Sequence, residues 1–390
     1  MGKLRVLMVR SNPYDFDPHS YNVQEIGIGK ALCDLGYDYD FLTFKKKDPK
    51  AWVFYECNDS KAQWIEVPRF RLLRWGINTS IYQKQFLSQY DLVICREYYQ
   101  YCTYKICRNH PNVYIYNGPY WNMFMPKFFS IFYDLFCTKK IDKNVKCIFT
   151  KSELSTDFLK KKGYHKLKTI GVGLDTSRFS DFSEKDISTE KLEAFMQKNK
   201  CILYVGNIDK NKNYLFMLKV YEQLLSKHPD LKFVVIGKSK QTAINKVLGK
   251  KDSSFEESCY KKVTEKTWAG IYRINRLDNT QLKYIYPLAK AFILPSKKEI
   301  FGMVMLEAMY LGVPVVTSIN GGSVTLIKDY VTGIKIKDYD TKKWVHAVDS
   351  LISDEKMRAN IIKAAKKLVV EEYNWDRIVS KMLDYIGDLK

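Results

Sequence analysis

The sequence predicts an α/β protein built from two Rossmann-like, doubly wound domains that face each other across a cleft. Three observations lead to this fold class. The chain has 390 residues, which is long for one typical domain and comfortable for two. Short apolar segments of the kind found in strands alternate with helical segments in both halves. A polar stretch at 180–200, rich in Ser, Glu, Asp and Lys, separates the halves.

The first half is expected to form a parallel sheet. A helix is expected at 23–35, ended by Gly36. Strands are expected at 4–9, 39–44, 91–95, 113–116 and 146–150. Continuous apolar strands separated by helices are typical of a parallel sheet that is covered on both faces. Because crossovers in such sheets are right-handed, a doubly wound layer follows.

The second half repeats this alternation. A helix is expected at 215–227. Strands are expected at 201–205, 233–236, 268–272, 291–294 and 314–317. In such a sheet, nucleotide phosphates bind where strands end and helices begin, because free backbone N–H groups and the positive helix end face the ligand there. We therefore expect a nucleotide site in the cleft.

Composition restricts the class of protein further. No apolar run reaches the roughly 18–20 residues that span a bilayer. The nine cysteines are scattered without CxxC spacing, which favours reduced thiols in a cytoplasmic protein over disulfides or zinc. The formal net charge of +21 fits a partner that is nucleic acid, anionic membrane or a phosphorylated small molecule, or else a generally basic surface. Nucleic acid ranks last, because no nucleic-acid module is recognisable.

The densest chemical signal lies at 294–317. A buried strand ends at Pro295, and a polar turn carries Glu299 to the carboxyl edge of the sheet. A helix then starts near Gly302, where a missing side chain lets a ligand approach the backbone. Glu307 lies in this helix among apolar neighbours, and a buried carboxylate needs hydrogen-bond donors. Ribose hydroxyls suit Glu307, donor-sugar hydroxyls suit Glu299, and the N–H groups of 301–304 suit a diphosphate. The alternative is that both glutamates are solvated charges.

These segments resemble the donor-site motifs of glycosyltransferase family 4. The segments 295–302 (PSKKEIFG) and 307–316 (EAMYLGVPVV) carry two glutamates with seven residues between them, as in that family. Three further matches are 171–179 (GVGLDTSRF), the turn 204–213 (YVGNIDKNKN) and the glycine pair 321–322. Asn374 and Trp375 resemble the start of the family's closing helix. The resemblance covers about residue 146 to the end well and the first third in outline.

The resemblance implies the GT-B fold, with domains at 1–175 and 176–372 and a helix at 373–390 that returns to the N-terminal domain. It implies a retaining transferase that moves a hexose from a UDP- or GDP-sugar to a glycan acceptor. No cofactor is implied beyond this donor substrate and no metal, because fixed positive charge replaces Mg²⁺. The catalytic residues implied are Glu299, Lys212 and Asn117. The donor-binding residues implied are Glu307, Phe301, Gly302, Met303, Val304, Asn207, Gly206, Lys210, Ile274 and Asn275.

The chain departs from the family in four places. Asn207 replaces an arginine of the first phosphate turn, and Lys210 is a candidate to compensate. Thr325 replaces a glutamate, and the N-terminal loop 11–21 lacks the usual glycines. Asn117 stands where many members have histidine. On the acceptor side we expect Tyr14, His19 and Glu97, although Glu97 and His19, like Asn117, fit a structural role equally well.

Two segments favour contact with an anionic membrane, as a lipid-linked acceptor would require. Residues 69–75 interleave arginine with bulky apolar side chains, and 120–140 combines aromatic residues with lysines. The alternative is a core helix packed on the N-terminal sheet. Two rival functions remain: an epimerase of the same fold acting on a UDP-sugar, and a non-catalytic binding partner.

Overall fold

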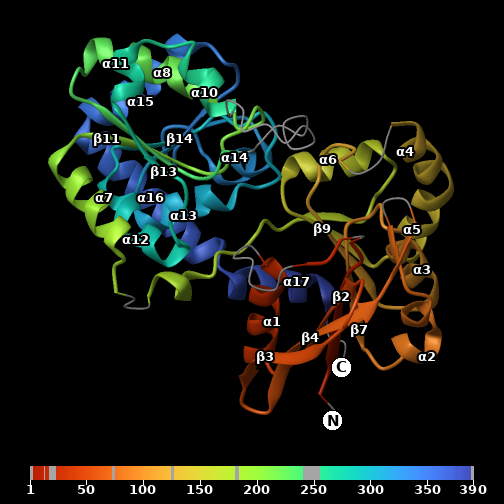
Figure 1. The fold of residues 1–390 in the computed structure, drawn as a ribbon. Coiled ribbons are helices and arrows are strands. Elements are labelled where there is room, and N and C mark those ends of the chain that lie inside the picture. The colour runs from red at the N-terminus through yellow and green to blue at the C-terminus, as the bar shows by residue number, and fades with distance from the viewer. Residues whose placement is uncertain are drawn as a thin grey trace. The chain divides into compact units, whose positions relative to one another are not determined.

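The computed structural model describes residues 3–12, 14–16, 23–72, 75–123, 127–180, 184–239 and 255–387. His19 lies outside these residues. The chain divides into two compact units, each with its own sheet (Figure 1). Unit 1 comprises Met1–Asp175 and Tyr373–Lys390, and unit 2 comprises Thr176–Glu372. The C-terminal helix α17 (Trp375–Ile386) therefore belongs to unit 1.

The sheet of unit 1 is parallel except at one edge. In spatial order its strands are β10 (Leu167–Thr169), β9 (Cys147–Thr150), β8 (Val113–Asn117), β7 (Leu92–Arg96), β1 (Arg5–Arg10), β2 (Asp38–Lys45), β4 (Ser60–Pro68) and β3 (Ala51–Cys57). The expected strands correspond to β1, β2, β7, β8 and β9. Their buried, apolar residues explain why the sequence pattern found them.

The sheet of unit 1 is parallel as expected except at the β3–β4 edge, which sequence analysis did not expect. These two strands form an antiparallel hairpin, and β4 pairs in parallel with β2. Asn58 has φ +51°, a left-handed conformation that asparagine tolerates, and with Asp59 it joins the two strands. A smaller antiparallel pair, β5 (Phe70–Leu72) and β6 (Trp75–Ile77), follows. Both hairpins lie between the strands that sequence analysis expected.

Helices cover the sheet of unit 1. Helix α1 (Gln24–Asp34), expected at 23–35, lies against β2, β3 and β4 and beside α17 (Figure 1). The remaining helical elements are η1 (Ser80–Tyr82), α2 (Lys84–Leu87), α3 (Tyr101–Asn109), α4 (Lys127–Tyr133), the π-helical turn η2 (Asp134–Thr138), α5 (Lys139–Asn144) and α6 (Glu153–Lys161). A large core joins α2, α3, α5 and α6 to the sheet through buried residues such as Leu87, Ile106, Ile141 and Leu159.

The sheet of unit 2 is parallel throughout its described strands, which makes this unit Rossmann-like. Its order is β13 (Ile271–Ile274), β12 (Lys232–Ile236), β11 (Cys201–Val205), β14 (Ala291–Leu294), β15 (Val315–Ser318) and β16 (Ile334–Ile336). The strand expected at 268–272 is partly wrong. Residues Glu265–Ala269 form helix α11, which ends at Gly270, and the strand begins only at Ile271.

Helices lie on both faces of this sheet (Figure 1). On one face lie α8 (Tyr214–Lys227), α10 (Phe255–Tyr260), α11 and α15 (Thr341–Ser353). On the other lie α7 (Ile187–Lys198), α12 (Leu282–Ile285), α13 (Met303–Leu311) and α16 (Glu355–Glu372). Shorter elements are η3 (Thr176–Phe179), η4 (Asn279–Gln281), η5 (Tyr286–Leu288) and α14 (Gly321–Leu326).

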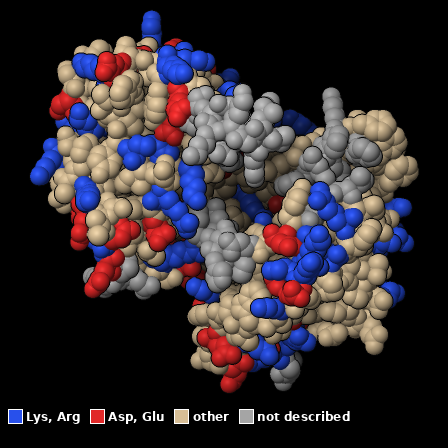
Figure 2. Space-filling model, viewed as in Figure 1, with Lys and Arg blue, Asp and Glu red and all other residues tan. Residues whose placement is uncertain are grey.

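Lysine and arginine side chains lie over both units on the face shown in Figure 2, among fewer acidic ones. No described helix combines the length and the apolar character that crossing a bilayer requires.

Candidate functional site

The segment between β14 and α13 forms a tight corner in unit 2. Gly302 has φ +76° and caps α13, so the helix starts where the sequence indicated. A Cβ atom at this position would lie 2.9 Å from Cε of Met305 and 3.0 Å from Cγ of Glu299. The backbone angle of the corner therefore favours glycine, and a side chain there would also have to displace the end of Met305. Phe301 precedes the cap, and Met303 and Val304 begin the helix with the first-turn amides that any helix start directs out of the helix.

The glycine pair Gly321–Gly322 packs directly against this corner. The amide of Gly321 donates a hydrogen bond to the carbonyl oxygen of Glu299 at 3.0 Å. A Cβ atom on Gly322 would lie only 1.7 Å from the carbonyl oxygen of Phe301. A side chain at 322 is therefore excluded by backbone, and the start of α14 holds the 299–302 corner in place.

Lys212 and Glu299 meet at the carboxyl edge of the sheet. The Lys212 ammonium donates to Oε2 of Glu299, and both side chains are about one-fifth exposed. The Lys212 amide donates to Asp209 at 2.8 Å, which fixes the turn after β11. Two residues predicted from distant segments are thus neighbours, and solvent still reaches both.

Asn211 connects the two segments, and sequence analysis missed it. Its Nδ2 donates to the carbonyl oxygen of Lys298 at 2.8 Å, and its Oδ1 accepts from the Lys298 amide at 3.1 Å. Its own carbonyl accepts from the Lys297 amide at 2.8 Å. Asn211 therefore sets the position of Lys212 relative to Glu299. The only available signal was an asparagine beside the predicted lysine.

Glu307 is almost completely buried, with 2% exposure. The Tyr286 hydroxyl donates to its Oε2 at 3.4 Å, and among described residues it makes no ion pair. Burial raises the pKa of Glu307 to about 7, although the Tyr286 hydroxyl and the charge of Arg178 act in the opposite direction. Its carboxylate is therefore short of donors, which ligand hydroxyls can supply.

The ends of β11, β12 and β13 come together beside this region. The Gly206 amide donates to Ile236, and the Gly237 amide donates to the carbonyl of Ile274, each at 2.9 Å. Arg273 donates to the carbonyls of Gly237 and Ile274 and is held by Glu256, with Nε at 2.5 Å. Sequence analysis missed Arg273.

The predicted polar residues in these turns are placed at the surface. Asn207, Lys210 and Asn275 are exposed, so each is accessible to a ligand. The backbone carbonyl of Asn207 accepts a hydrogen bond from the Tyr204 hydroxyl at 2.7 Å. The Asn207 side chain takes no part in this bond. Within the described ranges, no three His, Cys, Asp or Glu side chains group closely enough to hold a metal ion.

In unit 1, the predicted residues do not form one cluster at the surface. Asn117 is fully buried, and its Nδ2 donates to Ser155 Oγ at 2.9 Å and to the carbonyl of Pro119 at 3.1 Å. Because these bonds already use its donors, the geometry does not favour the predicted contact with a donor sugar. Tyr14 is 55% exposed, and Arg71 lies over its ring at 5.2 Å. The prediction for His19 falls outside the described residues.

Glu97 belongs instead to a buried charge cluster, which sequence analysis missed. It follows β7 with φ +67°, and its Oε2 accepts from the Gly118 amide at 3.2 Å. Arg96 donates to Oε1 of Glu25 at 2.5 Å, and Arg10 reaches the same oxygen at 3.3 Å. Burial alone would raise the pKa of Glu25, but these two arginines lower it overall.

Lys151 completes this charge cluster, defined as Arg10, Glu25, Arg96, Glu97 and Lys151. It directly follows β9 and is 3% exposed. Its Nζ has no hydrogen bond or ion pair among the described residues and lies 4.8 Å from the ring centre of Tyr116. Burial, together with the positive charges of Arg96 and Arg10, lowers the pKa of Lys151 to about 7. The negative charges of Glu97 and Glu25 act in the opposite direction.

Comparisons with known proteins agree with this description of the chain. Residues 186–368 match the family described as glycosyl transferases group 1. An uncharacterized glycosyltransferase of Methanocaldococcus jannaschii is 30% identical over 223 residues, which are 56% of this chain and 53% of that protein. The capsular polysaccharide biosynthesis glycosyltransferase CapM of Staphylococcus aureus is 27% identical over 224 residues, which are 55% of each chain. The chain thus spans about half the length of these curated relatives.

The likeness in structure extends over the whole chain. Anabaena HepE, solved in complex with UDP-glucose, has a TM-score of 0.69 and 14% identity, and the match covers 98% of this chain and 99% of HepE. At that identity the likeness concerns the fold. The chain therefore has the GT-B fold of two Rossmann-like domains, and its segment 186–368 matches the glycosyl transferases group 1 family.

Proposed function

We propose that this protein is a retaining, metal-independent glycosyltransferase of the family 4 type, which transfers a hexose from a nucleotide-diphosphate sugar to a glycan. One observation carries the proposal. The start of α13 has an accessible Lys212–Glu299 pair on its loop side and a buried, donor-poor Glu307 one turn into the helix. The group 1 match and a fold shared with a UDP-glucose-binding protein support it.

Each group has a proposed task in donor binding. Hydroxyls of the hexose replace Lys212 as donors to Glu299, and ribose hydroxyls donate to Glu307. Lys212 is thereby released toward the diphosphate, which the first-turn amides of α13 also contact. Gly206, Ile274 and Asn275 border the nucleotide through backbone atoms, with Asn207 and Lys210 at the surface.

The proposed reaction needs no separate base. The bond between the anomeric carbon and the phosphate oxygen breaks, and the acceptor oxygen forms its bond on the same face of the sugar. The acceptor proton passes to the departing phosphate oxygen. Lys212 and the amides of α13 stabilise the negative charge that develops on the diphosphate.

Substitution of the two glutamates tests this assignment. We expect Glu299→Gln and Glu307→Gln to weaken binding of UDP-glucose or GDP-mannose at least about tenfold in calorimetry, with loss of transfer. Glu265→Gln, an exposed glutamate of α11, is the matched control. Unchanged donor binding in both variants would falsify the site. Sugar-nucleotide turnover without any acceptor would instead indicate the epimerase.

We further propose that the acceptor is lipid-linked and that unit 1 contacts an anionic membrane. Five apolar side chains of α4 and η2 are between 45% and 68% exposed: Phe128, Ile131, Phe132, Leu135 and Phe136. Their spacing places them on one helical face, whereas Tyr133 points inward and donates to the carbonyl of Tyr98 at 2.7 Å. The core-helix alternative therefore accounts for Tyr133 but not for these five.

Positive charge follows this apolar stripe directly. Lys139, Lys140 and Lys143 are exposed on the adjoining α5. An apolar face bordered by lysines suits the headgroup region of an anionic bilayer. The relative CapM acts in capsular polysaccharide biosynthesis, which is consistent with such an acceptor.

Vesicle sedimentation tests the membrane contact. We expect binding to phosphatidylglycerol vesicles at low salt, little binding to phosphatidylcholine, and loss of binding in Leu135→Ser/Phe136→Ser. Ile187→Ser, an equally exposed apolar residue of unit 2, is the control. Equal binding by the double variant and the control would contradict the proposal.

A further inference from the structure

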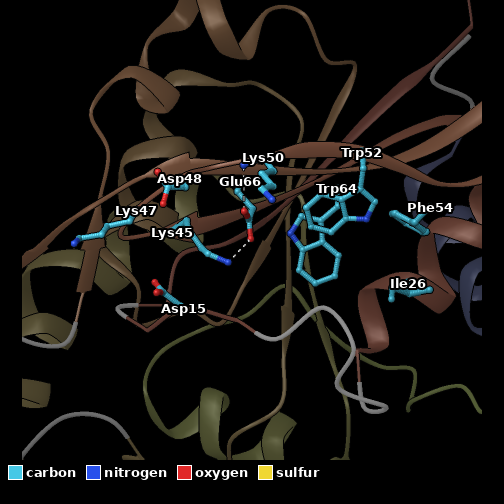
Figure 3. Close-up of a pocket in the computed structure, with 10 residues that line it drawn as sticks. All are labelled: Asp15, Ile26, Lys45, Lys47, Asp48, Lys50, Trp52, Phe54, Trp64 and Glu66. Carbon is cyan, nitrogen blue, oxygen red and sulfur yellow. Dashed lines mark hydrogen bonds and ion pairs between the residues drawn. The ribbon is translucent and has the colours of Figure 1, made fainter.

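A cavity of about 780 Å³ opens in unit 1 between the ends of β2 and β4 and the start of β3 (Figure 3). Its size lies within the roughly 300–1,000 Å³ usual for small-molecule sites. We call it the tryptophan pocket, after Trp52 and Trp64, which line it. Aromatic and apolar side chains gather at one end and charged side chains at the other (Figure 3). The pocket is thus amphipathic along its length.

The aromatic end is held rigidly. Trp52 and Trp64 are directly paired across the β3–β4 hairpin and stack with ring centres 5.2 Å apart and an interplanar angle of 18°. Trp64 Nε1 donates to Thr43 Oγ1 at 2.7 Å, and Phe41 packs edge-on against its ring at 4.6 Å. Trp64 is only 1% exposed, so it fixes the position of Trp52, and the half-buried Trp52 ring presents an apolar face that requires no ordering when a ligand arrives.

The charged end has both paired and unpaired groups. Lys45 donates to Glu66 at 3.0 Å, and the Lys50 amide donates to the other oxygen of Glu66 at 3.1 Å. Among the described residues, the ammonium groups of Lys47 and Lys50 and the carboxylate of Asp48 make no ion pair or hydrogen bond. Asp48 has φ +49°, so its backbone is held in a conformation that residues with a side chain rarely adopt.

Three lysines and three acids line the pocket: Lys45, Lys47, Lys50, Asp15, Asp48 and Glu66. Arg69 pairs with Asp15 at 2.9 Å and adds one positive charge beside them. Such a mixed lining is neither a purely cationic nor a purely anionic surface, and it offers strong donors and strong acceptors side by side. Sugar hydroxyls are both donor and acceptor, and the C–H face of a pyranose is apolar.

From this arrangement we infer that the tryptophan pocket binds an uncharged pyranose unit of a glycan. The ring packs against the exposed face of Trp52, and its hydroxyls bridge Asp48 and the ammonium groups of Lys47 and Lys50. The site lies at the carboxyl ends of β2 and β4, the edge at which parallel sheets bind ligands. The inference rests on the proposed function, because it names the chemistry of the acceptor side of that reaction.

Binding of simple glycosides to the whole chain tests the inference without any nucleotide present. The probes are the methyl α-pyranosides of glucose, mannose and galactose, together with glucuronic acid and glucose 6-phosphate. Saturation-transfer NMR identifies the binders, and calorimetry gives affinities. We expect at least one neutral glycoside to bind, and the two acidic sugars to bind more weakly than it does.

Two variants locate the binding. Trp52→Ala is expected to lower affinity for the neutral glycoside about tenfold, and Asp48→Asn about threefold. Val53→Ala, the next residue of β3, and Asp59→Asn, at the far end of the hairpin, are matched controls that leave the affinity unchanged. Thermal melting of each variant verifies that the fold is intact.

The outcomes separate this inference from the proposed function. Failure of every neutral glycoside to bind, tighter binding of an acidic sugar, or binding that survives Trp52→Ala overturns the pyranose site. UDP titration into the same preparations reports on the donor site of unit 2. If UDP binds and no glycoside does, only the pyranose site in the tryptophan pocket is contradicted. If a glycoside binds and UDP does not, only the donor site of unit 2 is contradicted.

Discussion

The carboxyl edges of the two sheets differ in how their buried charges are balanced. In unit 2, Glu307 is buried with a single weak hydrogen bond from Tyr286. In unit 1, Glu25 accepts from both Arg10 and Arg96, and the buried cation Lys151 is the group left without such a partner. One edge therefore lacks donors for a carboxylate, while the other carries a cation in excess.

This difference shows what each edge is prepared to receive. A donor-poor carboxylate favours ligands with hydroxyl groups, because they supply hydrogen bonds that the protein leaves out. A charge cluster that is already paired internally is mainly structural, and only its unpaired member remains available. The following substitutions test whether the two edges differ in this way.

Removal of Glu25 is expected to have the largest effect. Glu25→Ala leaves Arg10, Arg96 and Lys151 together in a buried region without their main counter-charge. Breaking a buried ion pair in this way costs about 3–5 kcal/mol of the free energy of unfolding. Urea unfolding measures this cost. Glu153→Ala, at the exposed start of α6, is the control, and equal midpoints for the two variants would mean that the cluster contributes no stability.

The pH dependence of stability is expected to reveal Lys151. Its pKa is about 7 in the folded protein, well below the ordinary lysine value, so the unfolded chain binds more protons between these two values. Stability therefore rises with pH above about 7, by on the order of 2–3 kcal/mol over two pH units. Lys151→Met is expected to flatten this rise in urea unfolding. A rise that persists in the variant must come from another group.

Glu307 is expected to give the opposite slope. Its pKa of about 7 lies above the ordinary glutamate value, so the folded protein binds more protons between these values. Its contribution is complete at acidic pH and is lost as pH rises to about 7, by on the order of 2 kcal/mol. Glu307→Gln removes this loss, so the ligand-free variant should be more stable than wild type at about pH 8 while binding the donor less well.

The proposed donor gives Glu307 a second, independent signature. Ribose hydroxyls that donate to the carboxylate favour its ionised form, so donor binding near pH 7 releases a proton. Calorimetry in buffers of different ionisation enthalpy detects this release, and Glu307→Gln should abolish it. Proton release that is unchanged in the variant would assign it to a different group.

The contrast between the edges also explains which parts sequence analysis could predict. In unit 2, the strand, the glycine and the two glutamates of the candidate site lie in one continuous segment. The residue types of that segment were enough to predict that α13 starts at Gly302 and that Glu307 is buried. In unit 1, residues 10, 25, 96 and 151 converge only through the order of strands in the sheet. No local pattern connects them, so the charge cluster could not be predicted.

The same reasoning applies to the elements of the fold. Buried strands with continuous apolar residues were recognisable, whereas β3 and β4 have alternating exposure and were missed. The tryptophan pocket depends on that hairpin, because Trp52 and Trp64 meet only when β3 folds back on β4. The strand misplaced at 268–272 shows the converse, since its apolar residues fit a helix as well as a strand until Gly270 ends it.

Asn211 offers the finest test of the comparison, because it acts through position rather than charge. Asn211→Ala removes both side-chain bonds to Lys298 and is expected to cost about 1 kcal/mol of stability. If the edge of unit 2 is a prepared donor site, nucleotide-sugar affinity should fall further than this, because Lys212 loses its register with Glu299. Asn279→Ala in η4 provides the control for a lost, half-buried asparagine of unit 2. A fall in stability with unchanged affinity would show that Lys212 finds the diphosphate unaided, and Asn211 would then be structural alone.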